Sequence, residues 1–281
     1  MKKRVITSVA VLLGMLLLAL LSNYIVYPIG IAILAIGAVF EILRVIGVHK
    51  KLLISLPAYI IACVFPICAF FVTSQNVTGL LLLFAAAMFV YLLWLLGVSV
   101  FSRGSIAFSR VSEVFATVTY VAYAFTSLSI IRYLDEIFGM YFLVLVFAIA
   151  WPTDIFAFAV GTLFGKHKLI PEVSPKKSVE GAIGGVVFSA IFCLLYGLVV
   201  DLLIPNVKVE YLTLFIFGLV LSVVSQLGDL IASLIKREYG VKDYGRIFPG
   251  HGGIMDRFDS VLAVATVLLI LCLAFPPFAI V

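Results

Sequence analysis

Polar residues at helical spacing interrupt one apolar stretch near the end of this chain. Ser222, Gln226, Asp229, Ser233 and Lys236 follow one another at intervals of four, three, four and three residues. On a helix this spacing places all of them on one side, as a polar stripe along an apolar rod. Because such a stripe needs something polar to face, we interpret this segment as the active site.

A charged segment that contains several glycines follows the stripe and ends in Gly250-His251-Gly252-Gly253. A new apolar run begins just after it. The segment 222–260 therefore predicts a helix, a loop and a second helix. The charges gather where the loop meets the helices, at Lys236, Arg237, Asp256, Arg257 and Asp259.

Two carboxylates in this segment, Asp229 and Asp256, are placed so that they could share one site. Asp229 lies seven residues before Lys236, about 10 Å along a helix, and Asp256 opens the next helix. If the two helices are antiparallel neighbours, both side chains reach one cavity on the inner side of the membrane. The structural alternative for Asp229 is a buried, hydrogen-bonded carboxyl group.

The glycines at the end of the loop point to an anion. Gly250, Gly252 and Gly253 allow the backbone to approach a ligand closely, just before a helix whose N-terminal amides favour phosphate. His251 can bind a metal or carry a proton, but hydrogen bonding to phosphate or backbone is the favoured interpretation.

The stretch from Ser233 to Asp259, SLIKREYGVKDYGRIFPGHGGIMDRFD, resembles the signature of the phosphatidate cytidylyltransferases, also called CDP-diacylglycerol synthases. The resemblance extends more loosely to Asp154 and to the loop Ser174-Pro175-Lys176-Lys177. Upstream of about residue 140 only the hydrophobic layout agrees. The matching signature positions are Ser233, Lys236, Arg237, Lys242, Asp243, Pro249, His251, Gly252, Gly253, Asp256, Arg257 and Asp259.

The resemblance implies a reaction in which the phosphate of phosphatidic acid attacks the α-phosphorus of CTP, giving CDP-diacylglycerol and diphosphate. It implies Mg²⁺ held by Asp229 and Asp256, allows a second cation such as K⁺, and implies a homodimer. Lys236 and Arg237 would act beside the two carboxylates. Substrate contacts would come from Asp154, Ser174, Lys176, Lys177, Ser233, Lys242, Arg246, His251, Gly252, Gly253, Arg257 and Asp259.

The composition indicates a membrane protein. With 64% apolar and 12% charged residues, the chain has too little polar surface to cover a water-soluble globule of 281 residues. Backbone groups in lipid must bond internally, so runs of about 20 apolar residues predict an all-α integral membrane protein. We expect nine transmembrane helices, at residues 5–22, 24–43, 52–72, 77–98, 112–131, 140–163, 181–204, 211–235 and 258–276.

The basic residues predict the orientation. Alternate loops assigned to one side hold 17 of the 19 Lys and Arg residues, all except Arg132 and Lys208. Positive loops stay cytoplasmic, so the N-terminus should be cytoplasmic, the C-terminus outside, and the polar cavity open to the cytoplasm. The positive net charge is thus explained mostly by membrane orientation, and it does not indicate binding of nucleic acid.

The first 24 residues resemble a secretory signal, but we expect an uncleaved first helix.

The chain divides by chemistry into two predicted regions. Residues 1–139 are predicted to form a transmembrane scaffold. Residues 140–281 are predicted to form the catalytic region, with cytoplasmic loops 165–181 and 236–257. In the catalytic region, Trp151-Pro152-Thr153-Asp154 predicts a kinked helix that faces a wet cavity. The alternative for Asp154 is a hydrogen-bonding group between helices.

Lys176 and Lys177 resemble triphosphate contacts, although the loop that carries them can also serve topology alone. Asp259 lies one turn from Asp256 and can support the metal site or pair with Arg257.

Two other functions fit parts of the pattern. A CTP-dependent kinase of polyprenols or phytol would need a general base where this sequence shows mainly cations. A secondary transporter would also carry intramembrane acids and a broken helix. Transporters usually contain inverted repeats, and no internal repeat is visible here. The predicted protein is therefore a multi-pass enzyme of the cell's inner (cytoplasmic) membrane, acting on CTP and a membrane lipid from the cytoplasmic side.

Overall fold

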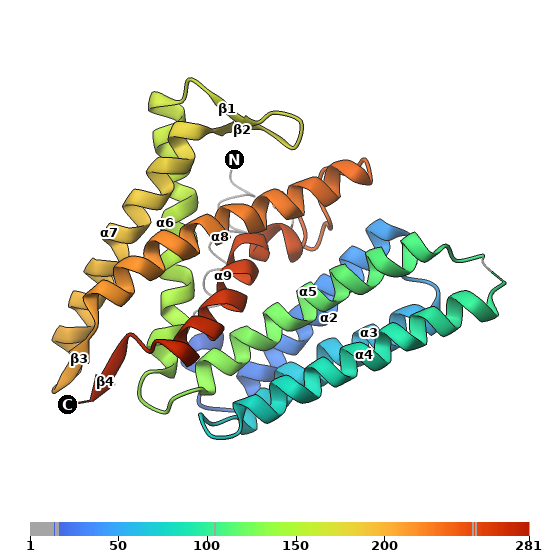
Figure 1. The fold of residues 1–281 in the computed structure, drawn as a ribbon, viewed down its shortest axis with the longest axis horizontal. Helices are drawn as coiled ribbons and strands as arrows, with labels where there is room; N and C mark the ends of the chain where they lie inside the picture. Colours follow the sequence, from blue (N-terminus) through green and yellow to red (C-terminus); the bar gives the residue numbers. More distant parts are fainter. Residues whose placement is uncertain (1–13, 15–16, 104, 249, 251, 281) are drawn as a thin grey trace. The chain divides into compact units, whose positions relative to one another are not determined.

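The protein is an all-α integral membrane protein. The structure, a computed structural model, describes residues 14, 17–103, 105–248, 250 and 252–280 (Figure 1). In this part of the chain, eight helices are long and apolar enough to cross a bilayer. They are α2 (Val26–Ile46), α3 (Leu52–Cys68, extended by the 3₁₀ turn η1, Ala69–Phe71), α4 (Val77–Phe101), α5 (Phe108–Tyr133), α6 (Gly139–Phe164), α7 (Val179–Leu203), α8 (Tyr211–Glu238) and α9 (Met255–Ala274).

These eight helices confirm the second to ninth predicted spans, each of which overlaps one helix. The first predicted span, residues 5–22, lies largely outside the described residues. The predicted succession of helix, loop and helix at residues 222–260 is also confirmed, because α8 ends at Glu238 and α9 begins at Met255.

Two short antiparallel ladders accompany the helices. Strands β1 (Lys168–Ile170) and β2 (Ser174–Ser178) form a hairpin between α6 and α7, with Lys168 opposite Ser178 and Ile170 opposite Ser174. Strands β3 (Val207–Val209) and β4 (Phe278–Ile280) pair Val207 with Ile280. The β1–β2 hairpin carries Lys176 and Lys177, two of the predicted substrate contacts.

The chain forms two compact units. Unit 1 contains residues 1–136 and 239–257, and unit 2 contains residues 137–238 and 258–281. The loop after α8 therefore groups with the N-terminal helices, although it follows a helix of unit 2 in sequence. The division into a scaffold up to residue 139 and a catalytic region after it stays a prediction about function.

Unit 1 is built on α2, α3, α4 and α5. Tyr27 of α2 donates a hydrogen bond to the carbonyl of Leu128 in α5, at 3.1 Å. Tyr91 of α4 donates to the carbonyl of Ile54 in α3, at 3.2 Å. Small side chains allow the helices to approach closely, as is usual in membranes. The fully buried small residues of this core include Ala35, Ala38, Val39, Ala58, Ala62, Val118 and Val121.

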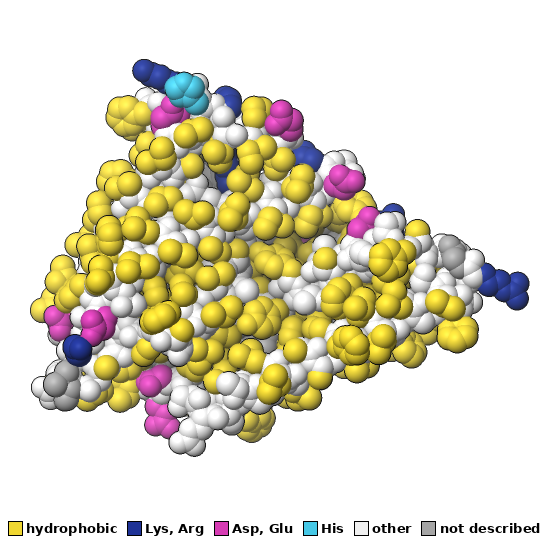
Figure 2. All heavy atoms as spheres, viewed as in Figure 1, with side chains coloured by type: hydrophobic (Ala, Val, Ile, Leu, Met, Phe, Trp, Pro, Cys, Tyr) yellow, Lys and Arg dark blue, Asp and Glu magenta, His cyan; other side chains and the backbone are white. Residues whose placement is uncertain are grey.

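Large apolar side chains remain exposed on the outer helix faces. Leu82 of α4 is 71% exposed and Leu202 of α7 is 86% exposed. Figure 2 shows a face dominated by hydrophobic side chains, with charged side chains gathered at its margins. This distribution is what lipid tails require of a protein surface.

In unit 2, α6 and α7 pack through glycine. A side chain on Gly181 would meet the carbonyl oxygen of Ala157 at 2.5 Å and the Cα of Gly161 at 2.9 Å. Ala157 and Gly161, four residues apart on α6, therefore allow α7 to pack closely at Gly181.

Replacing Gly181 with alanine should destabilise unit 2. The new methyl group meets backbone atoms, which cannot rotate away, so α6 and α7 must separate. We expect a loss of about 1–3 kcal/mol, typical of overpacking, measured as lower thermal stability in detergent. Gly79→Ala is the matched control, because nothing lies within 4 Å of a side chain there and alanine suits a helix better than glycine. Equal stability of the two variants would contradict this packing argument.

Candidate active site

A polar cavity of about 440 Å³ lies within unit 2. This volume falls in the range of roughly 300–1,000 Å³ that is usual for ligand pockets. Side chains from α6, from the β1–β2 hairpin and from α8 converge on it. Its polar lining includes Asp154, Thr162, Lys168, Lys176, Lys177, Ser178, Gln226 and Asp229.

An ion pair spans this cavity. The Lys177 Nζ atom lies 2.5 Å from Asp229 Oδ2, and the two side chains are 24% and 30% exposed. The pair joins β2 to the centre of α8. Both residues line the cavity, but the Lys177 Nζ atom is buried against the carboxylate, so an anionic ligand can reach the lysine only by displacing Asp229.

Two further carboxylates lie close to this pair. Asp229 interacts electrostatically with Asp154 and with Asp259. Ser260 connects the latter two, since its hydroxyl donates to Asp154 Oδ2 at 3.0 Å and its backbone N–H donates to Asp259 Oδ1 at 2.9 Å. Lys236 interacts with Asp259 from the end of α8. Three carboxylates near one another repel, so this part of the cavity favours cations.

The hairpin that carries the lysines is fixed at its base. Ser178 caps α7 by accepting a hydrogen bond from the Gly181 N–H at 3.2 Å. The Glu180 carboxylate accepts from the backbone N–H groups of Lys166, at 3.1 Å, and His167, at 3.2 Å. These bonds join both strands of the hairpin to the start of α7, and so position Lys176 and Lys177 at the cavity.

Two residues of the predicted polar stripe on α8 line the cavity. Gln226 and Asp229 line it, and Gln226 Nε2 donates to the carbonyl of Ala182 at 3.1 Å. Ser222 is fully buried, and its hydroxyl donates to the carbonyl of Leu219. Ser233 is half-buried further along the helix. The middle of the stripe therefore faces the polar side chains of the cavity, while the Ser222 hydroxyl is hydrogen-bonded within its own helix.

The loop between α8 and α9 (residues 239–254), the signature loop, lies in unit 1 and is held by hydrogen bonds to Asp256. This residue is 9% exposed, and its Oδ2 atom accepts from the backbone N–H groups of Tyr244, at 2.8 Å, and Gly253, at 2.9 Å. A backbone bridge from the Phe248 N–H to the Gly252 carbonyl, at 3.0 Å, closes the turn. Asp256 is in the first turn of α9, as predicted.

A second carboxylate, which the sequence analysis did not identify, holds the same loop. Glu41 of α2 is 1% exposed. Its Oε1 accepts from the Ile254 N–H at 3.1 Å and its Oε2 from the Met255 N–H at 3.0 Å. Arg44, one turn later, donates to the carbonyl of Tyr244 at 2.9 Å. An ionisable residue in an apolar run is costly and marks a functional position, and that signal was available in the sequence.

These carboxylates explain two of the loop glycines. A side chain on Gly253 would clash with the carboxylate oxygens of Glu41, and one on Gly252 would meet Asp256 Oδ2 at 2.6 Å. Gly252 also has a φ of +85°, which other residues rarely adopt. Close packing against carboxylates therefore requires glycine here, whether or not the backbone also approaches an anion.

The structure divides the predicted site residues between the two units. Unit 2 brings together Asp154, Lys176, Lys177 and Asp229 at the cavity, and Asp259 and Lys236 beside it. Arg237 Nε donates to the carbonyl of Val173, at 3.4 Å, next to the half-buried Ser174. In unit 1, Lys242, Arg246 and Arg257 are exposed. His251 lies outside the described residues. The residues that sequence reasoning missed are Glu41, Arg44, Lys168 and Ser260.

The donor set in unit 2 suits a hard divalent cation. Among the described residues, no group of three His, Cys, Asp or Glu side chains is arranged to hold a metal by itself. Mg²⁺ needs only one or two carboxylates when phosphates and waters complete its coordination. Asp229 offers an accessible carboxylate beside two others, so the residues present fit such an ion.

Comparison with known proteins agrees with this chemistry. The model of the "Cytidylyltransferase family" matches residues 2–275 of this sequence. It is 38% identical to a phosphatidate cytidylyltransferase of Bacillus subtilis (strain 168) over 271 residues, which cover 94% of each chain. It is 40% identical to a protein of the same name from Staphylococcus saprophyticus over 177 residues, 63% of this chain and 65% of that one. The Staphylococcus aureus (strain COL) protein of this name is 39% identical over 176 residues, 63% of this chain and 64% of that one. Since the family match spans nearly the whole sequence, this chain belongs to the cytidylyltransferase family.

Proposed function

We propose that this protein is a phosphatidate cytidylyltransferase, which converts CTP and phosphatidic acid to CDP-diacylglycerol and diphosphate. The relative that covers 94% of both chains carries this name. The structural observation that carries the proposal is the cavity of unit 2, where lysines for phosphates meet carboxylates for a cation. The membrane-spanning helices suit a lipid substrate.

The reaction needs alignment and positive charge more than it needs a base. A phosphate oxygen of phosphatidic acid forms a bond to the α-phosphorus of CTP. The bond from that phosphorus to the oxygen bridging to the β-phosphorus breaks, and diphosphate leaves with the electron pair. The attacking oxygen is already largely deprotonated at neutral pH. The site must therefore hold two anions together and stabilise the charge that develops on the leaving group.

The residues of unit 2 can meet these needs. Lys168, Lys176 and Lys177 bind the nucleotide phosphates, and Lys177 exchanges its contact with Asp229 for one with the triphosphate. Asp229, supported by the nearby acids Asp154 and Asp259, binds Mg²⁺. When bound, Mg²⁺ withdraws charge from the phosphate oxygens. Lys236 and Arg237, in the last turn of α8, add positive charge for the phosphates.

The signature loop supplies the remaining proposed contacts. Lys242, Arg246 and Arg257 are exposed basic residues that can attract either substrate. Asp256 is the second proposed ligand of Mg²⁺, and Gly252, Gly253 and His251 are proposed to contact phosphate. Ser174 and Ser233 complete the predicted substrate contacts. Because Asp256 also holds the loop through two backbone N–H groups, its replacement should damage both functions.

We assign the protein to the inner (cytoplasmic) membrane of the cell, with its N-terminus and active site facing the cytoplasm. The clustering of 17 of the 19 basic residues in alternate loops supports this orientation. A homodimer, and a second cation such as K⁺, are proposed from the family resemblance.

The decisive experiment is an assay of the purified protein. We expect diphosphate release from CTP only when phosphatidic acid and Mg²⁺ are both present, with chelation by EDTA abolishing it. A lipid kinase would instead yield CDP in the presence of a polyprenol or phytol, and a transporter would give neither product. The names of the relatives favour nucleotidyl transfer over both alternatives. Release of CDP, or no turnover of CTP, would overturn the proposal.

A further inference from the structure

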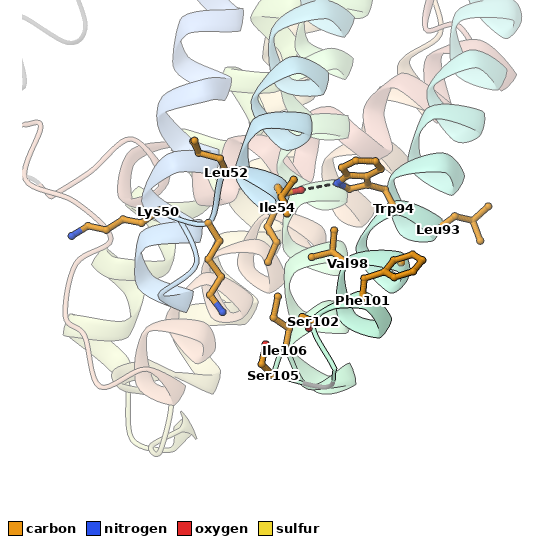
Figure 3. Close-up of a pocket in the computed structure, with 13 residues that line it drawn as sticks. Lys50, Leu52, Ile54, Leu93, Trp94, Val98, Phe101, Ser102, Ser105 and Ile106 are labelled. Atoms are coloured by element: carbon orange, nitrogen blue, oxygen red, sulfur yellow. Dashed lines mark hydrogen bonds between the residues drawn. The ribbon is translucent and has the colours of Figure 1, made fainter.

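A second cavity, which the proposed reaction does not use, lies within unit 1. It occupies about 780 Å³ where α3 begins and α4 ends, and Figure 3 shows its lining. This volume is typical of a ligand pocket. None of its lining residues belongs to the cavity of unit 2. Its occupant therefore need not be either substrate of the reaction.

The walls of this cavity are mostly apolar. Leu53 is 61% exposed, Trp94 is 47% exposed and Phe101 is 89% exposed. The indole N–H of Trp94 donates to the carbonyl of Leu53 at 2.6 Å, as the dashed line in Figure 3 marks. This bond joins α4 to α3 and fixes the ring as part of the wall. Such a surface suits a hydrocarbon chain.

One end of the same cavity is positively charged. Lys50 and Lys51 belong to its lining, and the lining contains no Asp or Glu. No ion pair involves either lysine among the described residues. In Figure 3 the Lys50 side chain extends away from Trp94 and Phe101, so its ammonium group is separate from these two rings. The hydroxyl-bearing residues Ser102 and Ser105 lie at the end of α4.

The position of the cavity identifies the ligand class. It lies at the ends of two membrane-spanning helices, where lipid headgroups meet acyl chains. A molecule that presents a phosphate beside a hydrocarbon chain matches both parts of the lining. We propose that this cavity binds one anionic phospholipid of the bilayer, with its phosphate at Lys50 and Lys51 and one acyl chain against Trp94 and Phe101.

The two tryptophans of the chain provide a direct test. Trp151→Phe leaves Trp94 as the only tryptophan, and Trp94→Phe leaves Trp151, which is 41% exposed on α6 of unit 2. Both proteins would be placed in bilayer discs that contain phosphatidylglycerol or phosphatidylcholine with brominated acyl chains. We expect the anionic lipid to quench Trp94 at a lipid fraction about 25-fold lower than the zwitterionic lipid requires. The two lipids should quench Trp151 at the same lipid fraction. Surface attraction of each lysine is worth roughly fivefold in affinity.

Two variants of the Trp94 protein separate the charge from the cavity. Lys50→Gln with Lys51→Gln should remove the preference for the anionic lipid. Gly97→Leu should also remove it, because Gly97 lines the cavity and nothing lies within 4 Å of a side chain placed there. Gly79→Leu is the matched control, since it is on the same helix and equally open. It should keep the preference.

Three results would overturn the proposal. The first is equal quenching of Trp94 by both lipids in the starting protein. The second is a preference that survives Gly97→Leu, which would mean that the lysines act only as surface charge. The third is a preference that survives removal of both lysines. Diphosphate release by each variant confirms that it is folded.

Discussion

Replacing Asp229 with asparagine should lower the rate of diphosphate release by about a hundredfold or more, the usual cost of removing one group that stabilises a transition state. The amide has nearly the shape of the carboxylate but lacks its charge. It cannot compensate Lys177, which lies 2.5 Å away, and it binds a divalent cation poorly. Turnover at saturating CTP and phosphatidic acid, over a range of Mg²⁺ concentrations, measures the effect. We also expect a higher Mg²⁺ requirement in any residual activity.

Asp201→Asn provides the matched control. Asp201 is an exposed residue of α7 that accepts a hydrogen bond from the Tyr211 hydroxyl at 3.0 Å, and it does not line the cavity. The same chemical change there should leave turnover within about twofold, because exposed substitutions usually have small effects. If folded Asp229→Asn protein kept a rate near that of the control, this carboxylate would have no part in the reaction.

Removing both members of the pair distinguishes catalysis from packing. If Asp229 mattered only because it neutralises Lys177, the double variant Asp229→Asn with Lys177→Met would recover activity. We expect instead that the double variant stays as inactive as Asp229→Asn, since both groups act on the substrates. Thermal stability can recover without recovery of turnover, and that combination would support separate structural and chemical roles.

The membrane made much of the fold predictable. A bilayer requires helices of about 20 apolar residues, so the lengths of the apolar runs revealed the spans without any packing information. The start of α9 was also predictable, because Asp256 follows the loop directly. Prediction was poorer at helix ends: α5 begins at Phe108 instead of residue 112, since its first turn contains serine and arginine that hydropathy alone does not recognise as helical.

The site was predictable where its residues share one helix. The spacing of Gln226 and Asp229 revealed a common face, and Asp154 was recognisable as an acid in hydrocarbon. Lys168 and Ser260 were not recognised, because their roles depend on the strand pairing of β1 and on the approach of α6 to α9. No local pattern encodes either contact.

Glu41 shows why a sequence motif cannot be interpreted from its own residues alone. It precedes the loop that it holds by more than two hundred residues, at Ile254 and Met255. The signature loop looked like a phosphate-binding segment because of its glycines. In the structure, Gly245 and Gly253 are also the positions where any side chain would clash with the Glu41 carboxylate. The requirement for glycine is therefore partly set by a residue of another helix.

Replacing Glu41 with glutamine should disable the signature loop while leaving the helices intact. A carboxylate accepts from both the Ile254 and the Met255 N–H groups, whereas an amide offers one oxygen and turns its NH₂ group toward the other donor. A buried donor left unpaired costs about 1–3 kcal/mol. The loop would move away from the NH₂ group, and displacement of functional groups by about 1 Å can cost a hundredfold in rate. We expect turnover to fall by about that factor.

Hydrogen exchange at the start of α9 measures the cause directly. The amide protons of Ile254 and Met255 should exchange faster in Glu41→Gln, by about tenfold or more, because their acceptor is weakened. Glu136→Gln is the control for the same change at an exposed position of unit 1. If turnover fell while exchange at Ile254 and Met255 stayed unchanged, Glu41 would act on the reaction by a route other than the loop. If neither turnover nor exchange changed, the two hydrogen bonds from the loop backbone to Glu41 would not contribute to the reaction.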